Sequence, residues 1–288
     1  MIKTLHEKAV LVKLVQHSWS GRKVDPKVGE HAAKSFEAKS ARIGRYYKQT
    51  FPKEDLADAA EIRRKAYTYH MTNTLPWMDG GVRMTPVTEL QAYLDFMRKC
   101  ETEHQAAVNK IAKNFADSVK LGMQLQGKMA NIADYPTAES IKSRFGLETI
   151  VMQLPSTTDW RIDVPKQQLT ELKAEAERDM QRLQQDALRD LWQRLSEEVG
   201  HVQERLNKDD AVFRNSLFEN IKEVVSVVAK LNFANDTQLE AMRKEVEAKL
   251  AKQTPDEVRA DQALRKKVAG DAAAIMKKMS TYMSGGKK

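Results

Sequence analysis

The 288-residue chain has few of the residues that interrupt or cross-link a fold. With only 12 glycines and 8 prolines, we expect long elements joined by few loops. The single cysteine, Cys100, excludes an intrachain disulfide and is typical of a reducing compartment, so we expect a cytoplasmic protein. No apolar run approaches the ~20 residues of a membrane-spanning helix, and we therefore expect no membrane partner.

Charge is plentiful, and it is unevenly distributed along the chain. Residues 1–50 contain 11 Lys/Arg against 4 Asp/Glu, and residues 259–288 contain 8 against 2. The 208 residues between them hold 29 basic and 34 acidic side chains. Basic ends around an acidic middle fit three interpretations: an anionic partner, head-to-tail self-association, or solvated surfaces without a partner.

Two stretches predict long helices, because apolar residues recur in them every three or four positions. They run from Pro86 to about Gln126 and from Lys166 to about Leu206, and each would span ~60 Å at 1.5 Å per residue. The first stripe consists of Leu90, Leu94, Met97, Cys100, His104, Val108, Ile111, Phe115 and Val119. The second consists of Leu169, Leu172, Ala176, Met180, Leu183, Ala187, Leu191, Leu195, Val199, Val202 and Leu206.

Strands are predicted over residues 8–19, 148–154 and 160–164, and the first should pair with the second because a lone strand is not stable. Residues 127–165 separate the long helices, so we expect the helices to fold back on each other. The predicted fold is mostly α (α+β), a long antiparallel helical hairpin with a small β-sheet head and additional packed helices. Its domains would be residues 1–85 (a strand and two basic or alanine-rich helices), 86–207 (the hairpin, with its head at 127–165) and 208–288 (C-terminal helices with a basic tail).

Residues 75–86, LPWMDGGVRMTP, are the least helical stretch between the predicted helices. Pro76 disfavours helix at the residue before it, Asp79-Gly80-Gly81 is a turn signal, and Thr85 could cap a helix that begins at Pro86. The interpretation that follows is a corner at which one helix stops and another starts. The alternative is a small loop in which Asp79 and Arg83 do chemistry.

A pair of Glu-x-x-His spacings is the only pattern that suggests a metal. Glu101 and His104 lie in the first long helix, and Glu198 and His201 lie in the second. Di-iron carboxylate bundles use two such pairs. In the expected hairpin, however, the pairs would miss each other by ~20 Å, whereas bridged metal ions need ~4 Å. We therefore expect no metal, no other cofactor and no catalytic residue.

Basic residues near both ends are the candidate binding residues. Lys27 to Gln49 is predicted as a helix, and near its end a pair of tyrosines lies beside basic residues; aromatic and basic side chains together can stack bases while neutralising phosphates. A second basic set lies on an amphipathic helix near the C-terminus, suited to nucleic acid or a protein partner. The candidates are Arg22, Lys23, Arg42, Arg45, Tyr46, Tyr47, Lys48, Arg265, Lys266, Lys267, Lys277 and Lys278.

Four stretches together resemble a phage and proteobacterial family classed as a domain of unknown function. They are SWSGRK (18–23), LPWMDGGVRMTPVTEL (75–90), ADYPTAESIKSRFGLE (133–148) and FRNSLFENIKEVVSVVAKLNFANDTQLEAMRKEVEAKL (213–250). Members resemble one another in being rich in helix, and are often encoded beside a MoxR-type ATPase and a von Willebrand A-type protein. The resemblance implies a phage protein in the host cytoplasm and no catalytic residue.

The leading hypothesis is a non-enzymatic phage protein that self-assembles through its long amphipathic helices and binds a macromolecular partner. One alternative is a DNA-binding, DNA-end-protecting coiled-coil protein, whose affinity would fall steeply with salt. Others are an adaptor of an AAA+ ATPase and a di-metal carboxylate protein. We thus expect a homo-oligomer, with nucleic acid or an AAA+ ATPase as possible partners.

Overall fold

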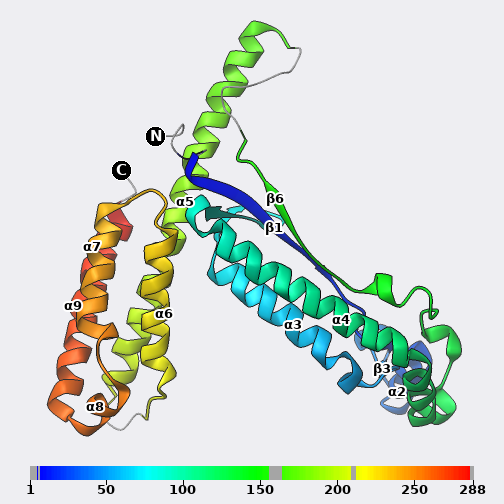
Figure 1. Ribbon diagram of the computed structural model, residues 1–288. Coiled ribbons are helices and arrows are strands. Elements are labelled where there is room, and N and C mark those ends of the chain that lie inside the picture. Colours follow the sequence, from blue (N-terminus) through cyan, green and yellow to red (C-terminus); the bar gives the residue numbers. More distant parts are fainter. Residues whose placement is uncertain (1–4, 6, 156–163, 209–211, 286–288) are drawn as a thin grey trace. The chain divides into compact units, whose positions relative to one another are not determined.

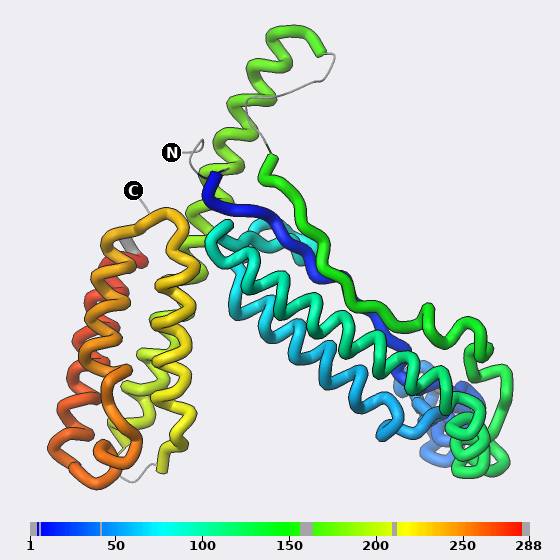
Figure 2. The backbone as a smooth tube through the Cα atoms, in the orientation of Figure 1, coloured from blue at the N-terminus to red at the C-terminus, as the bar shows by residue number. Residues whose placement is uncertain are grey.

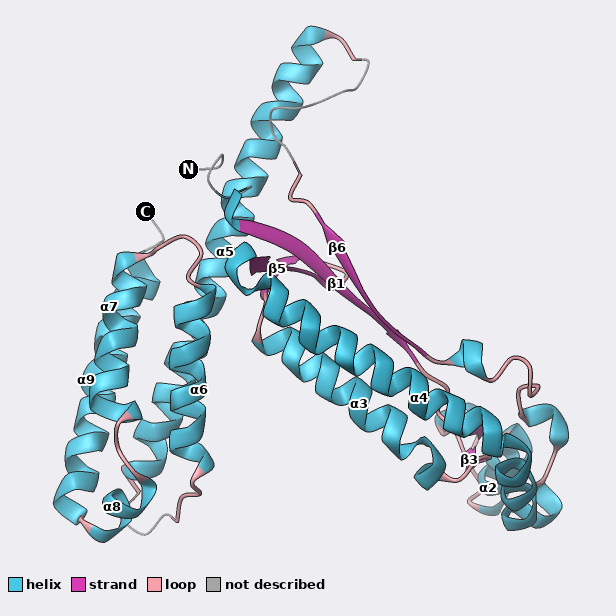
Figure 3. Ribbon diagram, in the orientation of Figure 1, coloured by secondary structure: helices cyan, strands magenta, loops and turns pink. Residues whose placement is uncertain are grey.

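A computed structural model describes residues 5, 7–155, 164–208 and 212–285 of the chain. The fold is mostly helical with a small antiparallel sheet, which confirms the predicted class (Figure 1, Figure 3). The chain forms two compact units. Unit 1 comprises Met1–Lys13, His70–Tyr93 and Val151–Lys288, and unit 2 comprises Leu14–Tyr69 and Leu94–Ile150. Within the described part, no helix is apolar over the length that a bilayer crossing needs.

The four-stranded sheet has the order β4-β5-β1-β6. Its strands are β1 (Ala9–His17), β4 (Leu75–Met78), β5 (Val82–Pro86) and β6 (Gly146–Met152). β6 lies next to β1, which confirms the predicted pairing of the first strand with residues 148–154. Most of the predicted third strand, residues 160–164, lies outside the described residues.

The stretch LPWMDGGVRMTP lies between a helix that ends at Thr72 and a helix that begins at Val87, and its turn is at residues 79–81, as predicted; the two strands that flank this turn were not predicted, and they make the connection a β-hairpin. β4 and β5 pair antiparallel, and β5 pairs antiparallel with β1 from Ala9↔Pro86 to Lys13↔Val82. Gly80 and Gly81 form the turn with φ of 78° and 81°, values that glycine adopts without strain. Pro76 is tolerated because β4 is an edge strand, and the ladder is irregular between Pro76 and Met78. Only the pairing with β1, distant in sequence, reveals these short strands.

Unit 1 contains a bundle formed by the C-terminal half of α5 with α6, α7 and α9 (Figure 2). Trp192 of α5 stacks on Tyr282 of α9 at 5.6 Å between ring centroids, and Ser196 contacts Met276, so these two helices run antiparallel. The bundle encloses a continuous apolar core. The helices are α5 (Lys166–Leu206), α6 (Ser216–Leu231), α7 (Thr237–Val246), a π-helical segment (Glu247–Ala251), α8 (Pro255–Ala260) and α9 (Gln262–Gly285).

Unit 2 is built on a second helix pair, residues 53–69 of α3 (Lys53–Thr72) and residues 94–126 of α4 (Val87–Gln126). Ser118 donates to Asp55 at 2.6 Å and Lys110 to Asp58 at 2.9 Å, so α4 runs antiparallel to α3. The unit also contains β2 (Arg22–Val24), α2 (Pro26–Ser35), β3 (Tyr47–Gln49) and 3-10 turns at Ala41–Ile43, Gly127–Met129, Ile132–Asp134 and Lys142–Arg144. Its core comprises Phe51, Leu56, Ala59, Ala107, Val108, Ile111, Phe115, Ile141 and Phe145.

The two long helices exist as predicted, but their packing partners differ from the prediction. The part of the α4 stripe from Val108 to Phe115 is buried in the core of unit 2 with α3, and the part of the α5 stripe from Met180 to Leu206 is buried in the core of unit 1 with α6 and α9. The described cores therefore replace the expected α4–α5 hairpin with two other helix pairs. The compact units are likewise built from separated segments, whereas the sequence predicted three contiguous domains. An amphipathic stripe indicates which face is buried, but it does not identify the element that covers it.

Candidate nucleic-acid interface

The basic residues near the N-terminus lie on and beside a two-stranded ribbon of β2 and β3. Arg42, Arg45 and Lys48 were predicted on a helix, and Arg22 and Lys23 in the loop before it. α2 ends at Ser35, and Glu37 has a φ of 52°, which breaks the predicted helix of residues 27–49. The ribbon register pairs Arg22 with Gln49 and Val24 with Tyr47. Figure 1 shows α2 and β3 near the end of α4.

One face of this ribbon carries a cation beside an aromatic ring. Directly paired residues share a face, as do residues two apart, so Arg22, Val24, Tyr47 and Gln49 lie together. The Nε of Arg22 donates to Oε1 of Gln49 at 3.2 Å, which holds the guanidinium on that face. Val24 and Tyr47 are exposed, Tyr47 to 53%. The ribbon thus presents an open ring next to a positioned positive charge.

Hydrogen bonds at Gly21 fix where the ribbon starts. Its carbonyl accepts from the backbone N–H of Thr50 at 2.8 Å, the Thr50 hydroxyl at 2.8 Å and the Gln49 amide at 3.1 Å. Gly21 has a φ of 62°, and a Cβ there would lie 3.0 Å from both Leu56 and Phe51. Gln126 at the end of α4 donates to the Gln49 carbonyl at 3.1 Å, which ties the ribbon to the long helix.

Lys48 is not available to a ligand, and its prediction as a contact residue was wrong. Its side chain is only 7% exposed, and its Nζ lies 2.7 Å from Asp134 and 3.3 Å from Asp25. The Nζ also donates to the carbonyl of Met129 at 2.7 Å. The hydrogen bond with Asp134 raises the pKa of Lys48, so the ammonium stays charged and is neutralised internally. Alternation along β3 turns Lys48 inward whenever Tyr47 faces outward.

The other predicted residues of this region are exposed. Arg42 lies in a 3-10 turn, and Arg45 and Tyr46 lie in the extended chain that follows it. Arg22, Lys23, Arg42 and Arg45 form no ion pair with any residue that the structure describes. Tyr46 is 41% exposed. On a helix, some of these aromatic and basic side chains would face the core. In the ribbon and the chain beside it, the rings of both Tyr46 and Tyr47 are exposed to solvent.

Three apolar side chains of the same region are also exposed, which the sequence did not indicate: Val24, Phe36 and Ile43. A helix over residues 27–49 would have turned Phe36 and Ile43 toward a core. Their exposure follows from the end of α2 at Ser35, which the local sequence did not indicate.

The C-terminal basic set divides into structural and exposed residues. Arg265 is buried: it donates to the carbonyls of Leu206 at 3.2 Å and Lys208 at 2.6 Å, and so caps the C-terminus of α5. Its prediction as a binding residue is corrected accordingly. Lys278 contacts both oxygens of Glu245 at 2.8 Å. The remaining residues, Lys266, Lys267 and Lys277, are exposed on α9 in unit 1.

The two Glu-x-x-His pairs lie in different units of the chain. Glu101 and His104 belong to unit 2, whereas Glu198 and His201 belong to unit 1. His104 is buried, which lowers the pKa of its imidazole, and His201 lies 3.5 Å from Glu198 of its own helix. No cluster of three or more potential metal ligands occurs among the described residues. Cys100 is buried too, and burial raises the pKa of its thiol.

Asp79 and Arg83, the alternative catalytic pair, are part of the β-hairpin. The Nε of Arg83 donates to the Thr74 hydroxyl at 2.6 Å, and its Nη2 donates to the Thr74 carbonyl at 2.8 Å. This buried guanidinium therefore has a structural role: it donates hydrogen bonds to Thr74, just after the end of α3. Asp79 lies at the turn of the hairpin.

Comparison with known proteins gives no relative: no family model, no curated protein and no solved structure matches this chain. The resemblance to the phage and proteobacterial family stays a prediction.

Proposed function

We propose that this protein binds single-stranded nucleic acid through the ribbon surface, defined as Arg22, Lys23, Arg42, Arg45, Tyr46 and Tyr47. The observation that carries the proposal is the exposure of both tyrosines beside four arginine and lysine side chains that have no ion-pair partner among the described residues. Single strands are bound by such combinations because bases stack on aromatic rings while cations neutralise the backbone.

The charge of the region supports this proposal. Residues 20–50 contain eight Lys/Arg and three Asp/Glu, and Lys48 with Asp25 forms part of an internal cluster. Most of the other basic side chains face water. A surface with this surplus attracts a polyanion over a distance of about one Debye length, ~10 Å at 0.1 M salt.

The test is fluorescence anisotropy with a labelled oligothymidylate at several salt concentrations. Each cation that neutralises a phosphate of a single strand contributes about −0.7 to the slope of log K against log salt. With four cations, the expected slope is about −3, and replacement of Arg22, Lys23, Arg42 and Arg45 by alanine should bring it close to zero. A Tyr47→Ala variant should bind roughly five- to a hundredfold more weakly, since one base stack contributes ~1–3 kcal/mol.

Tyr67→Ala is the matched control, because Tyr67 is 47% exposed on α3 of the same unit and lies outside the ribbon surface. Unchanged binding by Tyr47→Ala, or an equal loss in Tyr67→Ala, would contradict the proposal. If the protein bound duplex more tightly than single strands, base stacking on the tyrosines would be contradicted, although the cations could still bind phosphates.

Self-association is the second candidate function, and a different observation favours it. Most apolar side chains of the two long helices are buried in the two cores, but several apolar side chains around the end of α4 are exposed. They are Leu121, Leu125 (76% exposed), Met129 and Ile132. Light scattering at two salt concentrations tests this: an oligomer that becomes monomeric in Leu125→Ser/Ile132→Ser would support assembly through this patch, and a wild-type monomer at both concentrations would exclude it. An AAA+ ATPase partner remains a prediction of the family resemblance.

A further inference from the structure

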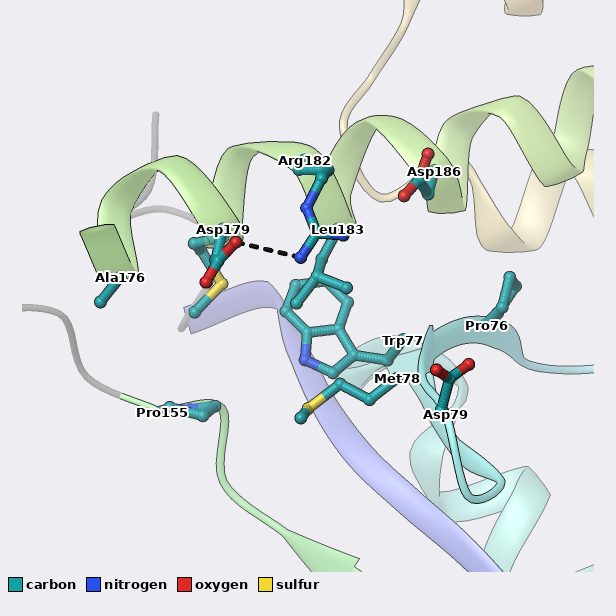
Figure 4. A pocket seen from close by; sticks show the side chains of 11 residues that line it. Pro76, Trp77, Met78, Asp79, Pro155, Ala176, Asp179, Arg182, Leu183 and Asp186 are labelled. Atoms are coloured by element: carbon teal, nitrogen blue, oxygen red, sulfur yellow. Dashed lines mark hydrogen bonds and ion pairs between the residues drawn. The ribbon is translucent and has the colours of Figure 1, made fainter. Parts of the chain in front are cut away.

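A pocket of about 660 Å³ lies in unit 1 between the β-hairpin and the N-terminal half of α5 (Figure 4). Its walls are mainly apolar, with Trp77 and Met78 from β4 and Ala176, Met180 and Leu183 from α5. Sites that hold small ligands or inserted side chains have this size and this lining. Two of the wall residues are methionines, whose unbranched side chains repack around a guest.

The wall of the pocket contains a buried hydrogen-bond donor, the indole N–H of Trp77, that no described residue satisfies. Trp77 is 2% exposed, and its Nε1–H has no hydrogen-bond partner among the described residues. In Figure 4 the indole nitrogen lies on the side of the ring that faces Pro155. A buried donor without an acceptor is destabilising, so a guest that brings a carbonyl oxygen to it recovers part of the lost free energy.

The charged residues of the pocket are mostly acidic. The pocket is lined by three aspartates, Asp79, Asp179 and Asp186, and by one cation, Arg182. Arg182 forms an ion pair with Asp179 at 3.0 Å. Asp186 is paired with Arg189 at 2.9 Å, whereas Asp79 forms no ion pair with a described residue. The pocket therefore favours a guest with a positive charge, and it disfavours the phosphates that suit the ribbon surface.

We infer that this pocket binds a short peptide segment of a partner protein, in which an apolar side chain is followed by a lysine or arginine. The apolar side chain packs between Trp77 and Leu183, and the cation lies beside Asp79. A backbone carbonyl of the segment accepts from the Trp77 Nε1–H. A peptide supplies all three groups within two residues, and this site is independent of the ribbon surface.

The experiment titrates protein labelled with ¹⁵N at its tryptophan side chains with N-acetyl-leucyl-lysine amide. The indole resonance of Trp77 is assigned by its loss in Trp77→Phe. We expect this resonance to shift saturably, with a dissociation constant of about 1 mM for so small a probe. N-acetyl-leucyl-glutamate amide and N-acetyl-seryl-lysine amide should each bind at least about fivefold more weakly, which corresponds to ~1 kcal/mol for the lost ion pair or apolar contact.

Two alanines of α5 provide a matched pair of variants. Ala176 lines the pocket, whereas Ala174 is exposed on the same helix and does not. Ala176→Trp should fill the pocket and abolish the shift, and Ala174→Trp should bind like the wild type. Asp79→Asn should remove the preference for the lysine probe over the glutamate probe. A Trp77 resonance that none of the probes moves, equal shifts by all three, or an unchanged preference in Asp79→Asn would overturn the inference.

Discussion

At the scale of single residues, burial decides the chemistry of several groups that the sequence left open. His70 is buried, and its Nδ1 lies 2.7 Å from the hydroxyl of Tyr93. Burial, together with the positive charge of Arg83, lowers the pKa of His70 to about 4. The imidazole is therefore neutral in the folded protein at pH 7, and a protonated His70 is not compatible with this environment.

This shift predicts a loss of stability on mild acidification. An unfolded chain protonates His70 below its ordinary pKa of about 6.5, whereas the folded protein does not until about pH 4. His70 does not lower the stability above pH 6.5; as the pH falls toward 4 the free energy of unfolding decreases, and the decrease due to this group reaches about 2–3 kcal/mol at pH 4.5. Urea unfolding between pH 7 and 4.5 measures it.

The variant His70→Gln isolates this contribution from those of the carboxyl groups. Its free energy of unfolding should depend less on pH than that of the wild type over this interval. His31→Gln, at an exposed position of α2, should retain the wild-type pH dependence. Identical pH profiles for wild type and His70→Gln would show that the residue does not couple protonation to folding.

At the scale of elements, the end of α3 shows how distant residues complete a local structure. A helix C-terminus leaves carbonyls without intrahelical partners and carries a partial negative charge. Arg194 of α5 donates to the carbonyls of Met71 at 3.1 Å, Thr72 at 2.8 Å and Thr74 at 2.9 Å. Arg83 of β5 donates to the Thr74 carbonyl as well. Two guanidinium groups thus join helix, hairpin and α5 within unit 1.

Removal of Arg194 should therefore cost more than removal of a surface arginine. We expect Arg194→Ala to lower the free energy of unfolding by about 1–3 kcal/mol, since three carbonyls lose a donor and Asp190, 2.7 Å away, loses its cation. Arg189→Ala, which breaks an exposed pair with Asp186, should change it by less than about 0.5 kcal/mol. Arg194→Lys should fall between them because lysine lacks the planar fork. Equal denaturant midpoints for Arg194→Ala and Arg189→Ala would refute this assignment.

At the scale of the whole molecule, the described residues form two apolar cores, one in each compact unit. Leu195 lies in the core of unit 1, and Phe115 lies in the core of unit 2, where it stacks on Phe51 with 5.7 Å between ring centroids. Each core buries its own set of helix faces. Local stability should therefore differ between the two units and respond separately to substitution.

Hydrogen exchange tests this separation. Leu195→Ala and Phe115→Ala each create a cavity, with an expected cost of about 2–5 kcal/mol. We expect Leu195→Ala to accelerate exchange chiefly in the helices of the unit 1 bundle, and Phe115→Ala chiefly in α3 and α4. Each variant serves as the control for the other. A uniform acceleration across both units in either variant would show one cooperative structure in place of two.

The sequence by itself determined the helical class, the two long helices, the first strand and its partner at 148–154. These features depend on local periodicity, because the spacing of apolar residues along the chain indicates both the type of element and the face of it that is buried. It did not determine the hairpin of β4 and β5, because short strands with a proline and two glycines are stabilised by pairing with β1 and not by their own propensity. It also did not determine which helices share a core, or that Lys48 and Arg265 would be held internally while Tyr46 and Tyr47 stay open. Those outcomes belong to the tertiary structure, because a side chain becomes structural or available only through contacts with residues far away in the chain.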